Sequence, residues 1–193
     1  MMQHRIKGIY LFIVLGCFAV LSGCRNSYED IVQNELESGV VKDSLWYGIK
    51  FKMTRQQFEE DAFEMNQRGL FKESGLGLME LKFPDEFKYP VDCEFYPEFK
   101  NEIIVGMSGR FNYMYWNGFN RDYDNIVLLK ELLPKMETWF QGGEFLEMDL
   151  KEPASRVGPV YVKVDGNREL RVWNDINLEH VNFSIMDLTA IQD

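Results

Sequence analysis

Oxygen-bearing side chains in the second half of the chain are the first candidates for chemistry. Four of them match positions 1, 3, 5 and 12 of a calcium-binding loop: Asn120, Asp122, Asp124 and Glu131. The ninth position of that loop falls on Leu128, whose side chain supplies no oxygen and holds no water molecule. The alternative is that Asp122 or Asp124 caps a following helix and complements its dipole. We expect capping, and we assign no metal site.

Residues suited to catalysis are sparse. His180 has no serine or cysteine motif beside it, so the sequence does not support a nucleophile–histidine pair. The acidic run 59–61 and the pair Asp122/Asp124 supply carboxylates of the kind that hydrolyse glycosidic bonds. Because the chain contains 31 Asp and Glu residues, such neighbours arise from composition alone. We therefore assign no catalytic residue and no cofactor.

An aromatic segment, residues 110–120 with the sequence RFNYMYWNGFN, is the best candidate for a binding surface. Tyr113, Tyr115 and Trp116 are the candidate ligand-binding residues, and Trp46 is a further aromatic candidate. Exposed aromatic rings stack on sugar rings, and the neighbouring asparagines would donate hydrogen bonds to hydroxyl groups. The alternative is that both faces of this segment are buried, because aromatic side chains supply much of the area of protein cores. We expect burial for most of these rings.

The N-terminal residues are arranged as a secretion signal. Arg5 and Lys7 precede an apolar run without charges, residues 8–20, and small residues follow it. The uncharged stretch from Gly8 to Cys24 is 17 residues long. A helix that crosses a bilayer needs about 20 apolar residues. The segment is therefore expected to direct secretion rather than to span a membrane.

The residues Leu21-Ser22-Gly23-Cys24 resemble the bacterial lipobox. The resemblance implies that a diacylglyceryl group is added to the sulfur of Cys24, and that a peptidase then cuts before it. The alternative is an uncleaved short anchor with a chance cysteine. One acyl chain holds a protein only weakly, and each buried methylene contributes about 0.8 kcal/mol, so two or more chains give stable attachment. We expect residues 1–23 to be a signal peptide and Cys24 to be the site of lipid attachment at the cell envelope.

Processing changes the composition of the chain. Residues 1–23 contain Arg5 and Lys7 but no acidic residue, which leaves 19 basic and 31 acidic residues and a formal net charge of −12. This charge argues against nucleic acid as a partner. The expected partners are the membrane, through the lipid, and an envelope protein or a glycan. Cys93 would be the one cysteine left without a lipid, and we expect it to be a buried small hydrophobe.

Local patterns divide the mature chain into a flexible tether, residues 24–43, and a single domain, residues 44–193. Thr54 and Gln57 form a capping box that predicts a helix over residues 54–69. A second helix is expected from Asp124 to Leu133, and the apolar positions after Pro134 indicate a kink or a restart.

Period-two alternation predicts strands at 44–52, 78–83, 91–96, 103–108, 110–116, 145–150, 160–164, 169–173 and 181–186. Asp165-Gly166 marks a hairpin between two of these strands. Because short turns rather than helices join the strands, a parallel sheet is excluded. The expected fold is α+β, with one twisted antiparallel sheet of about seven to nine strands and two helices packed on one face.

Three stretches together resemble a group of uncharacterised lipoproteins and secreted proteins of Bacteroidota: LWYGIKFKMTRQQFEEDAFEMNQRGL, MYWNGFN, and VKVDGNRELRVW followed by FSIMDLTA. The resemblance covers most of residues 44–190 and implies an envelope address without a known activity. The entry into the first helix is also similar to that of outer-membrane-assembly lipoproteins related to β-lactamase-inhibitor modules, although Lys52 stands where that pattern has Gly.

Three functional hypotheses follow. The leading one is a non-enzymatic binding or accessory module that Cys24 tethers to a membrane. The second is a carbohydrate-binding surface lipoprotein that uses exposed aromatics, and the third is a carboxylate-dependent hydrolase.

Overall fold

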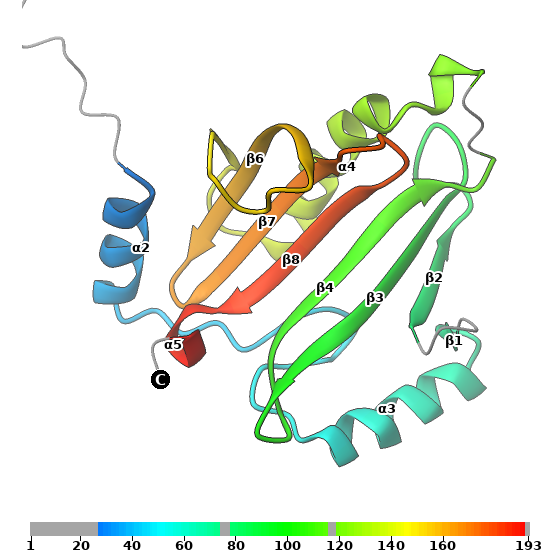
Figure 1. Ribbon diagram of the computed structural model, residues 1–193. Helices are drawn as coiled ribbons and strands as arrows, with labels where there is room; N and C mark the ends of the chain where they lie inside the picture. The colour runs from blue at the N-terminus through cyan, green and yellow to red at the C-terminus, as the bar shows by residue number, and fades with distance from the viewer. Residues whose placement is uncertain (1–26, 74–77, 116–118, 192–193) are drawn as a thin grey trace, which may run out of the picture. The chain divides into compact units, whose positions relative to one another are not determined.

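The computed structural model describes residues 27–73, 78–115 and 119–191 of the chain (Figure 1). The chain divides into two compact units, Met1–Ile31 and Val32–Asp193. In the first unit, the hydroxyl of Ser27 accepts a hydrogen bond from the backbone N–H of Asp30, at the start of helix α2 (Tyr28–Glu37). No helix within the described ranges is long and apolar enough to cross a membrane.

The second unit is built on one antiparallel sheet of eight strands, in the order β1-β2-β3-β4-β8-β7-β6-β5. The strands are β1 (Lys72–Glu73), β2 (Met79–Phe83), β3 (Val91–Lys100), β4 (Ile103–Tyr113), β5 (Leu146–Met148), β6 (Arg156–Asp165), β7 (Arg168–Asp175) and β8 (Val181–Asp187). The expected α+β class and the antiparallel sheet are confirmed. The hairpin predicted at Asp165-Gly166 joins β6 to β7. The two strands expected at 103–108 and 110–116 form one strand, β4, because Gly109 continues the ladder between them.

Helix α3 (Arg55–Gln67) begins where its sequence signal predicts. The backbone N–H of Thr54 donates to the Gln57 side chain at 2.9 Å, and the Thr54 hydroxyl accepts from the Gln57 N–H at 3.2 Å. This reciprocal pair satisfies two backbone donors that a helix start otherwise leaves without partners. The capping box is therefore confirmed.

Helix α4 (Asn125–Phe140) continues through Pro134, as the apolar positions beyond that residue indicated. Its buried residues include Leu128, Leu132 and Met136, and it packs on β4, β7 and β8. Proline removes one hydrogen bond from a helix interior. Burial of the apolar side chains on both sides of Pro134 compensates for that loss. The short helix α5 (Leu188–Ile191) follows β8.

The two faces of the sheet differ in the helices that pack on them. Alternate residues of the central strands, such as Cys93, Phe111 and Phe183, point to one face and are fully or almost fully buried. Figure 1 shows α4 behind the sheet, and the opposite face turned to the viewer. The expected packing of two helices on one face is not confirmed, because the buried Phe58 of α3 contacts Tyr96, which alternates onto the opposite face.

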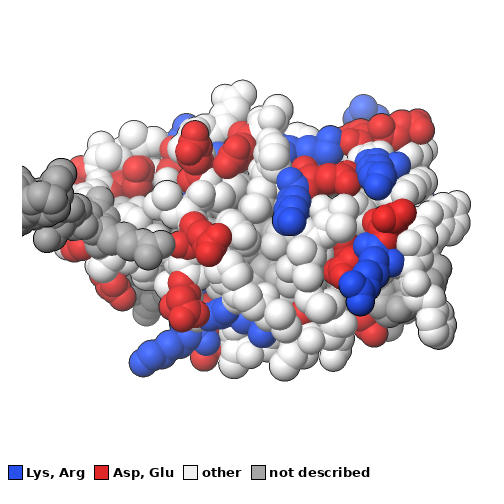
Figure 2. All heavy atoms as spheres, turned by 90° about the horizontal axis from the view of Figure 1, so that it is seen from above, with Lys and Arg blue, Asp and Glu red and all other residues white. Residues whose placement is uncertain are grey.

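Charged side chains of both signs are mixed on the surface seen from above in Figure 2. Lys and Arg side chains of the described residues lie among Asp and Glu side chains there, rather than in a separate basic area. Nucleic-acid binding needs a basic stripe or patch. The distribution on this surface is consistent with the acidic composition of the chain.

Residues 44–52 form a turn whose apolar side chains enter the core, instead of the expected strand. Tyr47 and Gly48 both have positive φ angles, of 50° and 87°, and the N–H of Ile49 donates to the carbonyl of Trp46. In this turn Trp46 is buried and Tyr47 is exposed, which breaks the period-two pattern. The sequence alternation was misleading here, because burying the large Trp46 side chain outweighs local strand propensity.

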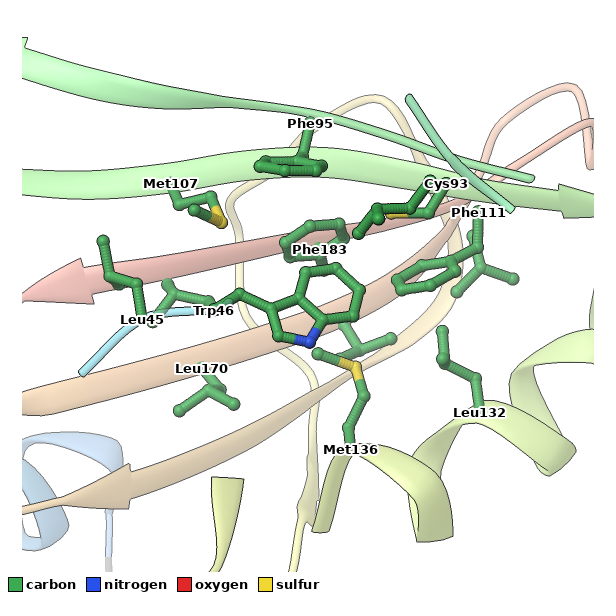
Figure 3. Packing of buried hydrophobic residues seen from close by; sticks show 14 of the residues in the cluster. Leu45, Trp46, Cys93, Phe95, Met107, Phe111, Leu132, Met136, Leu170 and Phe183 are labelled. Carbon is green, nitrogen blue, oxygen red and sulfur yellow. The ribbon is translucent and has the colours of Figure 1, made fainter. Parts of the chain in front are cut away.

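Trp46 lies at the centre of the hydrophobic core (Figure 3). Its ring centroid is between 5.3 and 6.3 Å from seven other aromatic rings, those of Tyr47, Phe83, Phe95, Phe111, Trp139, Phe140 and Phe183. Aromatic pairs at such separations add to the free energy that comes from their buried area. Figure 3 shows Met136 of α4 reaching the same cluster from the helix side.

The segment from Val32 to Asp43, which the sequence assigned to the flexible tether, contacts the β6–β7 hairpin. The N–H of Gly166 donates to the carboxylate of Glu35 at 2.9 Å, and the N–H of Lys42 donates to Asn167 Oδ1 at 2.7 Å. The Lys42 ammonium also lies 3.5 Å from the Asp165 carboxylate. This part of the predicted tether is therefore held against the domain.

Candidate functional site

The candidate lipid-attachment and ligand-binding residues differ in exposure, and two of them are not described by the structure. Cys24 and Trp116 lie outside the described residues. Tyr115 has 63% of its surface exposed just after β4, whereas Tyr113 is completely buried. Trp46, the further candidate, is 8% exposed in the core. The rings therefore do not form one common platform, and Tyr115 is the named ring that the structure shows at the surface.

The contacts of Tyr113 are those of a residue that stabilises the fold. Its ring packs against Tyr89 and Tyr123, and its hydroxyl donates to the Glu131 carboxylate at 3.1 Å. Burial, followed by the negative charge of Glu131, raises the pKa of the Tyr113 hydroxyl. The hydroxyl therefore stays protonated, and Tyr113 links β4 to α4.

Two of the residues that match the calcium-loop template, Asn120 and Asp124, are helix caps in the structure. Asp124 Oδ1 accepts a hydrogen bond from the N–H of Ile126 at the start of α4. Asn120 Oδ1 accepts from the N–H of Asp122 at the start of a short 3-10 helix, Arg121–Tyr123. Among the described residues, no group of three or more His, Cys, Asp or Glu side chains is placed to hold a metal ion.

Cys93 is fully buried, as its place in an alternating strand predicted. Burial raises the pKa of its thiol well above the ordinary value, and the neighbouring carboxylates Glu94 and Asp92 act in the same direction. A thiol becomes a nucleophile only as the thiolate. Cys93 is therefore a packing residue of the core.

A row of polar and aromatic side chains crosses the face of the sheet opposite α4. In the register of the sheet, Glu94 of β3 lies opposite Arg110 of β4, and Arg110 lies opposite Asn182 of β8. Asn182 in turn lies opposite Trp173 of β7. Directly opposite residues on one face have Cβ atoms about 5 Å apart. Four side chains from four different strands therefore lie side by side, although they are far apart in the sequence.

This row borders a shallow depression of about 310 Å³. Its lining comes from β3, β4, β7, β8 and the residue before β2: Leu78, Glu94, Phe95, Tyr96, Ser108, Gly109, Arg110, Trp173, Asn182 and Phe183. The small residues Ser108 and Gly109 lie on β4 in the middle of the sheet, while Tyr96 stands on the neighbouring strand β3 and Trp173 stands on β7, beyond β8. We call this feature the open-face depression.

An ion pair organises the centre of the open-face depression. Arg110 Nε donates to Glu94 Oε2 at 2.8 Å, and Arg110 Nη2 lies 2.5 Å from the same oxygen. Both contacts use one carboxylate oxygen, so the other oxygen of Glu94 takes no part in the pair. The side chains keep 38% and 22% of their surface exposed, which leaves this pair accessible to a bound molecule.

His180 lies further along the same face, in a second hollow of about 260 Å³ that Asn112 also lines. Burial lowers the pKa of the His180 imidazole, and the positive charge of Arg110 lowers it further. The imidazole is therefore neutral at pH 7. Its Nδ1 is buried and has no hydrogen-bond partner among the described residues.

Sequence reasoning did not find the open-face depression. A signal was present in the strands, where polar residues such as Glu94, Arg110 and Asn182 alternate with buried ones. That alternation shows which residues face away from the core. It does not show that β8 lies between β4 and β7, and this strand order is what brings Arg110, Asn182 and Trp173 together.

The open-face depression has to be interpreted from its own geometry. Comparison of the chain with models of known protein families, with curated proteins and with solved structures finds no match. The activity of a known protein is therefore not transferred to this chain. The residues that line the depression, their charges and their spacing are the basis for a functional proposal.

Proposed function

We propose that this chain is a lipid-anchored, non-enzymatic binding protein of the cell envelope that takes up a small polar ligand in the open-face depression. The anchor would be Cys24, in the lipobox-like residues 21–24 that follow an apolar signal segment. The ligand would be part of an envelope glycan or of another envelope component. The observation that carries this proposal is the row Glu94–Arg110–Asn182–Trp173 on the face of the sheet opposite α4.

The geometry favours binding over catalysis. The serines nearest to the row are Ser108 on β4 and Ser184 on β8, and each is four residues along its strand from Asn112 or His180. At about 3.3 Å per residue, the imidazole and either hydroxyl are about 13 Å apart. Direct proton transfer needs hydrogen-bond contact. Hydrogen bonding to a ligand, in contrast, needs only the donors and acceptors that the row presents.

Fractionation of cells grown with labelled palmitate tests the anchor. The wild-type chain is expected to stay in the membrane fraction after a high-salt wash and to carry the label. Cys24→Ser is expected to lose the label and to leave the membrane fraction. A Cys24→Ser variant that keeps both the label and the membrane association would overturn the lipid-anchor part of the proposal.

Crosslinking and co-purification from native membranes test the binding part. We expect an envelope component to be recovered with the wild-type chain and to be lost with Trp173→Ala or Asn182→Ala. Phe63→Ala, at an exposed position on α3, is the matched control and is expected to behave like the wild type. Unchanged recovery with both depression variants would show that the depression is not the binding site.

A further inference from the structure

We infer that the ligand of the open-face depression is an uncharged saccharide, one ring of which stacks on Trp173. This inference rests on the proposed binding function and narrows it to one ligand class. Four features of the depression support it: the state of its charges, the type of its polar groups, the two aromatic side chains on its border and its size.

The charges around the depression leave an anionic ligand no unpaired cation to bind. Arg110 is paired with Glu94, and Lys82 lies 3.1 Å from Glu80 on the neighbouring strand β2. His180 is neutral because its pKa is lowered by burial. A phosphate or sulfate group needs an unpaired cation or a set of free backbone donors. With each cation already next to a carboxylate, an anionic ligand gains no net attraction, whereas an uncharged polar ligand meets no repulsion.

The polar groups suit hydroxyl groups, which both donate and accept hydrogen bonds. The Asn182 carboxamide offers an acceptor and two donors, and the Ser108 hydroxyl offers both functions. The Arg110–Glu94 pair places guanidinium donors next to a carboxylate acceptor. Neighbouring hydroxyl groups of a sugar ring can bridge such donor–acceptor pairs, and each bond compensates for a lost bond to water.

Two aromatic side chains border the depression. Trp173 is half-buried on β7, and its buried Nε1 donates to none of the described residues. Tyr96 is fixed on the other side, because its hydroxyl accepts a hydrogen bond from Arg55 at 3.2 Å and its ring meets Phe58 edge-on. Rigid aromatic surfaces bind the apolar C–H faces of sugars at a small cost in side-chain entropy.

The size of the depression sets the length of the ligand and its affinity. A volume of about 310 Å³ lies at the lower end of the range for small-molecule sites. It has room for one or two sugar rings. A single ring of about 12 non-hydrogen atoms, bound at ordinary ligand efficiency, is expected to have a Kd in about the millimolar range. Several domains on one membrane surface would strengthen binding to a polymer through avidity.

The test uses the full chain, solubilised in detergent, and saturation-transfer NMR with a panel of neutral monosaccharides and disaccharides. The same sugars carrying sulfate or carboxylate groups form the second arm. We expect saturation of the ring protons of at least one neutral sugar, and binding at least about tenfold weaker for its charged counterpart. Equal or tighter binding of the charged sugars would overturn the inference.

Three variants separate stacking from folding. Trp173→Ala is expected to weaken sugar binding by about five- to tenfold, the effect of losing one aromatic stacking contact. Trp173→Phe keeps an aromatic plane and leaves no partner atom without its hydrogen bond, so we expect a loss of about threefold or less. Phe63→Ala is expected to bind like the wild type, and urea unfolding curves confirm that each variant is folded.

The outcomes distinguish failure of the ligand class from failure of the binding function. If a protein is crosslinked to the wild-type chain and lost with Trp173→Ala, but no sugar saturates, the depression binds a protein and the saccharide inference is wrong. If a neutral sugar binds equally to the wild type and to Trp173→Ala, the site lies elsewhere and both proposals for the depression are wrong.

Discussion

Gly109 is a position at which the sheet has no room for an added methyl group. A Cβ atom built there would lie 2.4 Å from the carbonyl oxygen of Glu94 and 2.6 Å from a ring carbon of Phe183. The carbonyl belongs to the neighbouring strand β3, so it cannot move away without disturbing the pairing of β3 with β4. Phe183 is 1% exposed and is enclosed by the core. Gly109→Ala must therefore displace a strand or a buried ring.

The expected cost follows from this geometry. Adding volume to a densely packed core lowers stability by about 1–3 kcal/mol. Alanine recovers up to about 1 kcal/mol relative to glycine, because the unfolded chain loses entropy. Since one of the two clashes is with backbone, we expect the upper part of that range and a net loss of about 2 kcal/mol in the free energy of unfolding. With a urea m-value of about 2 kcal/mol per molar, the unfolding midpoint falls by about 1 M.

Urea unfolding followed by circular dichroism measures this shift, and Gly143→Ala is the matched control. A Cβ atom at Gly143 meets no atom within 4 Å. The free energy of unfolding of Gly143→Ala is therefore expected to differ from that of the wild type by less than about 0.5 kcal/mol. Adding Phe183→Leu to Gly109→Ala is expected to cost less than the sum of the two single changes, because the smaller side chain relieves one clash. Equal midpoints for the two glycine variants, or strict additivity in the double variant, would refute the proposed close approach.

Three further predictions follow from other parts of the domain. Thr54→Ala removes the helix cap of α3 and is expected to lower the free energy of unfolding by about 1 kcal/mol in urea titrations; an unchanged midpoint would mean that the cap does not stabilise the folded state. Trp46→Ala leaves a cavity in the middle of the aromatic core and is expected to lower the free energy of unfolding by about 3–5 kcal/mol. The control Phe63→Ala, at an exposed position, is expected to lower it by less than about 0.5 kcal/mol. Similar losses for the two variants would contradict the central position of Trp46. Because the pKa of His180 is lower in the folded chain than its ordinary value of 6.5, the unfolded chain binds more protons below about pH 6.5, and stability falls as the pH drops from there. His180→Gln is expected to flatten that part of the profile of unfolding free energy against pH, and an unchanged slope between about pH 6.5 and 5 would show that another group is responsible.

Much of the local structure could be predicted because its causes are local. The Thr54–Gln57 box begins α3, Asp124 caps α4, and the Asp165-Gly166 turn joins two strands, each through contacts between residues close in sequence. The aromatic candidates were harder to place. Tyr113 and Tyr115 are two residues apart and would share one face of the strand predicted over residues 110–116, yet one is buried and the other exposed. Burial there depends on where β4 ends and on the cover that Tyr89 and Tyr123 provide over Tyr113.

The class of fold, the antiparallel pairing of neighbouring strands and the acidic charge could be predicted from the sequence by itself, because alternation, turn residues and composition are local properties. Its signal for lipid attachment at Cys24 stays a prediction. Two features follow from the packing of the domain and not from local patterns: Trp46 fills the core from a turn, and one row is formed by Glu94, Arg110, Asn182 and Trp173. Strand order and burial depend on the packing of the whole domain, and they bring together residues that no spacing in the sequence connects.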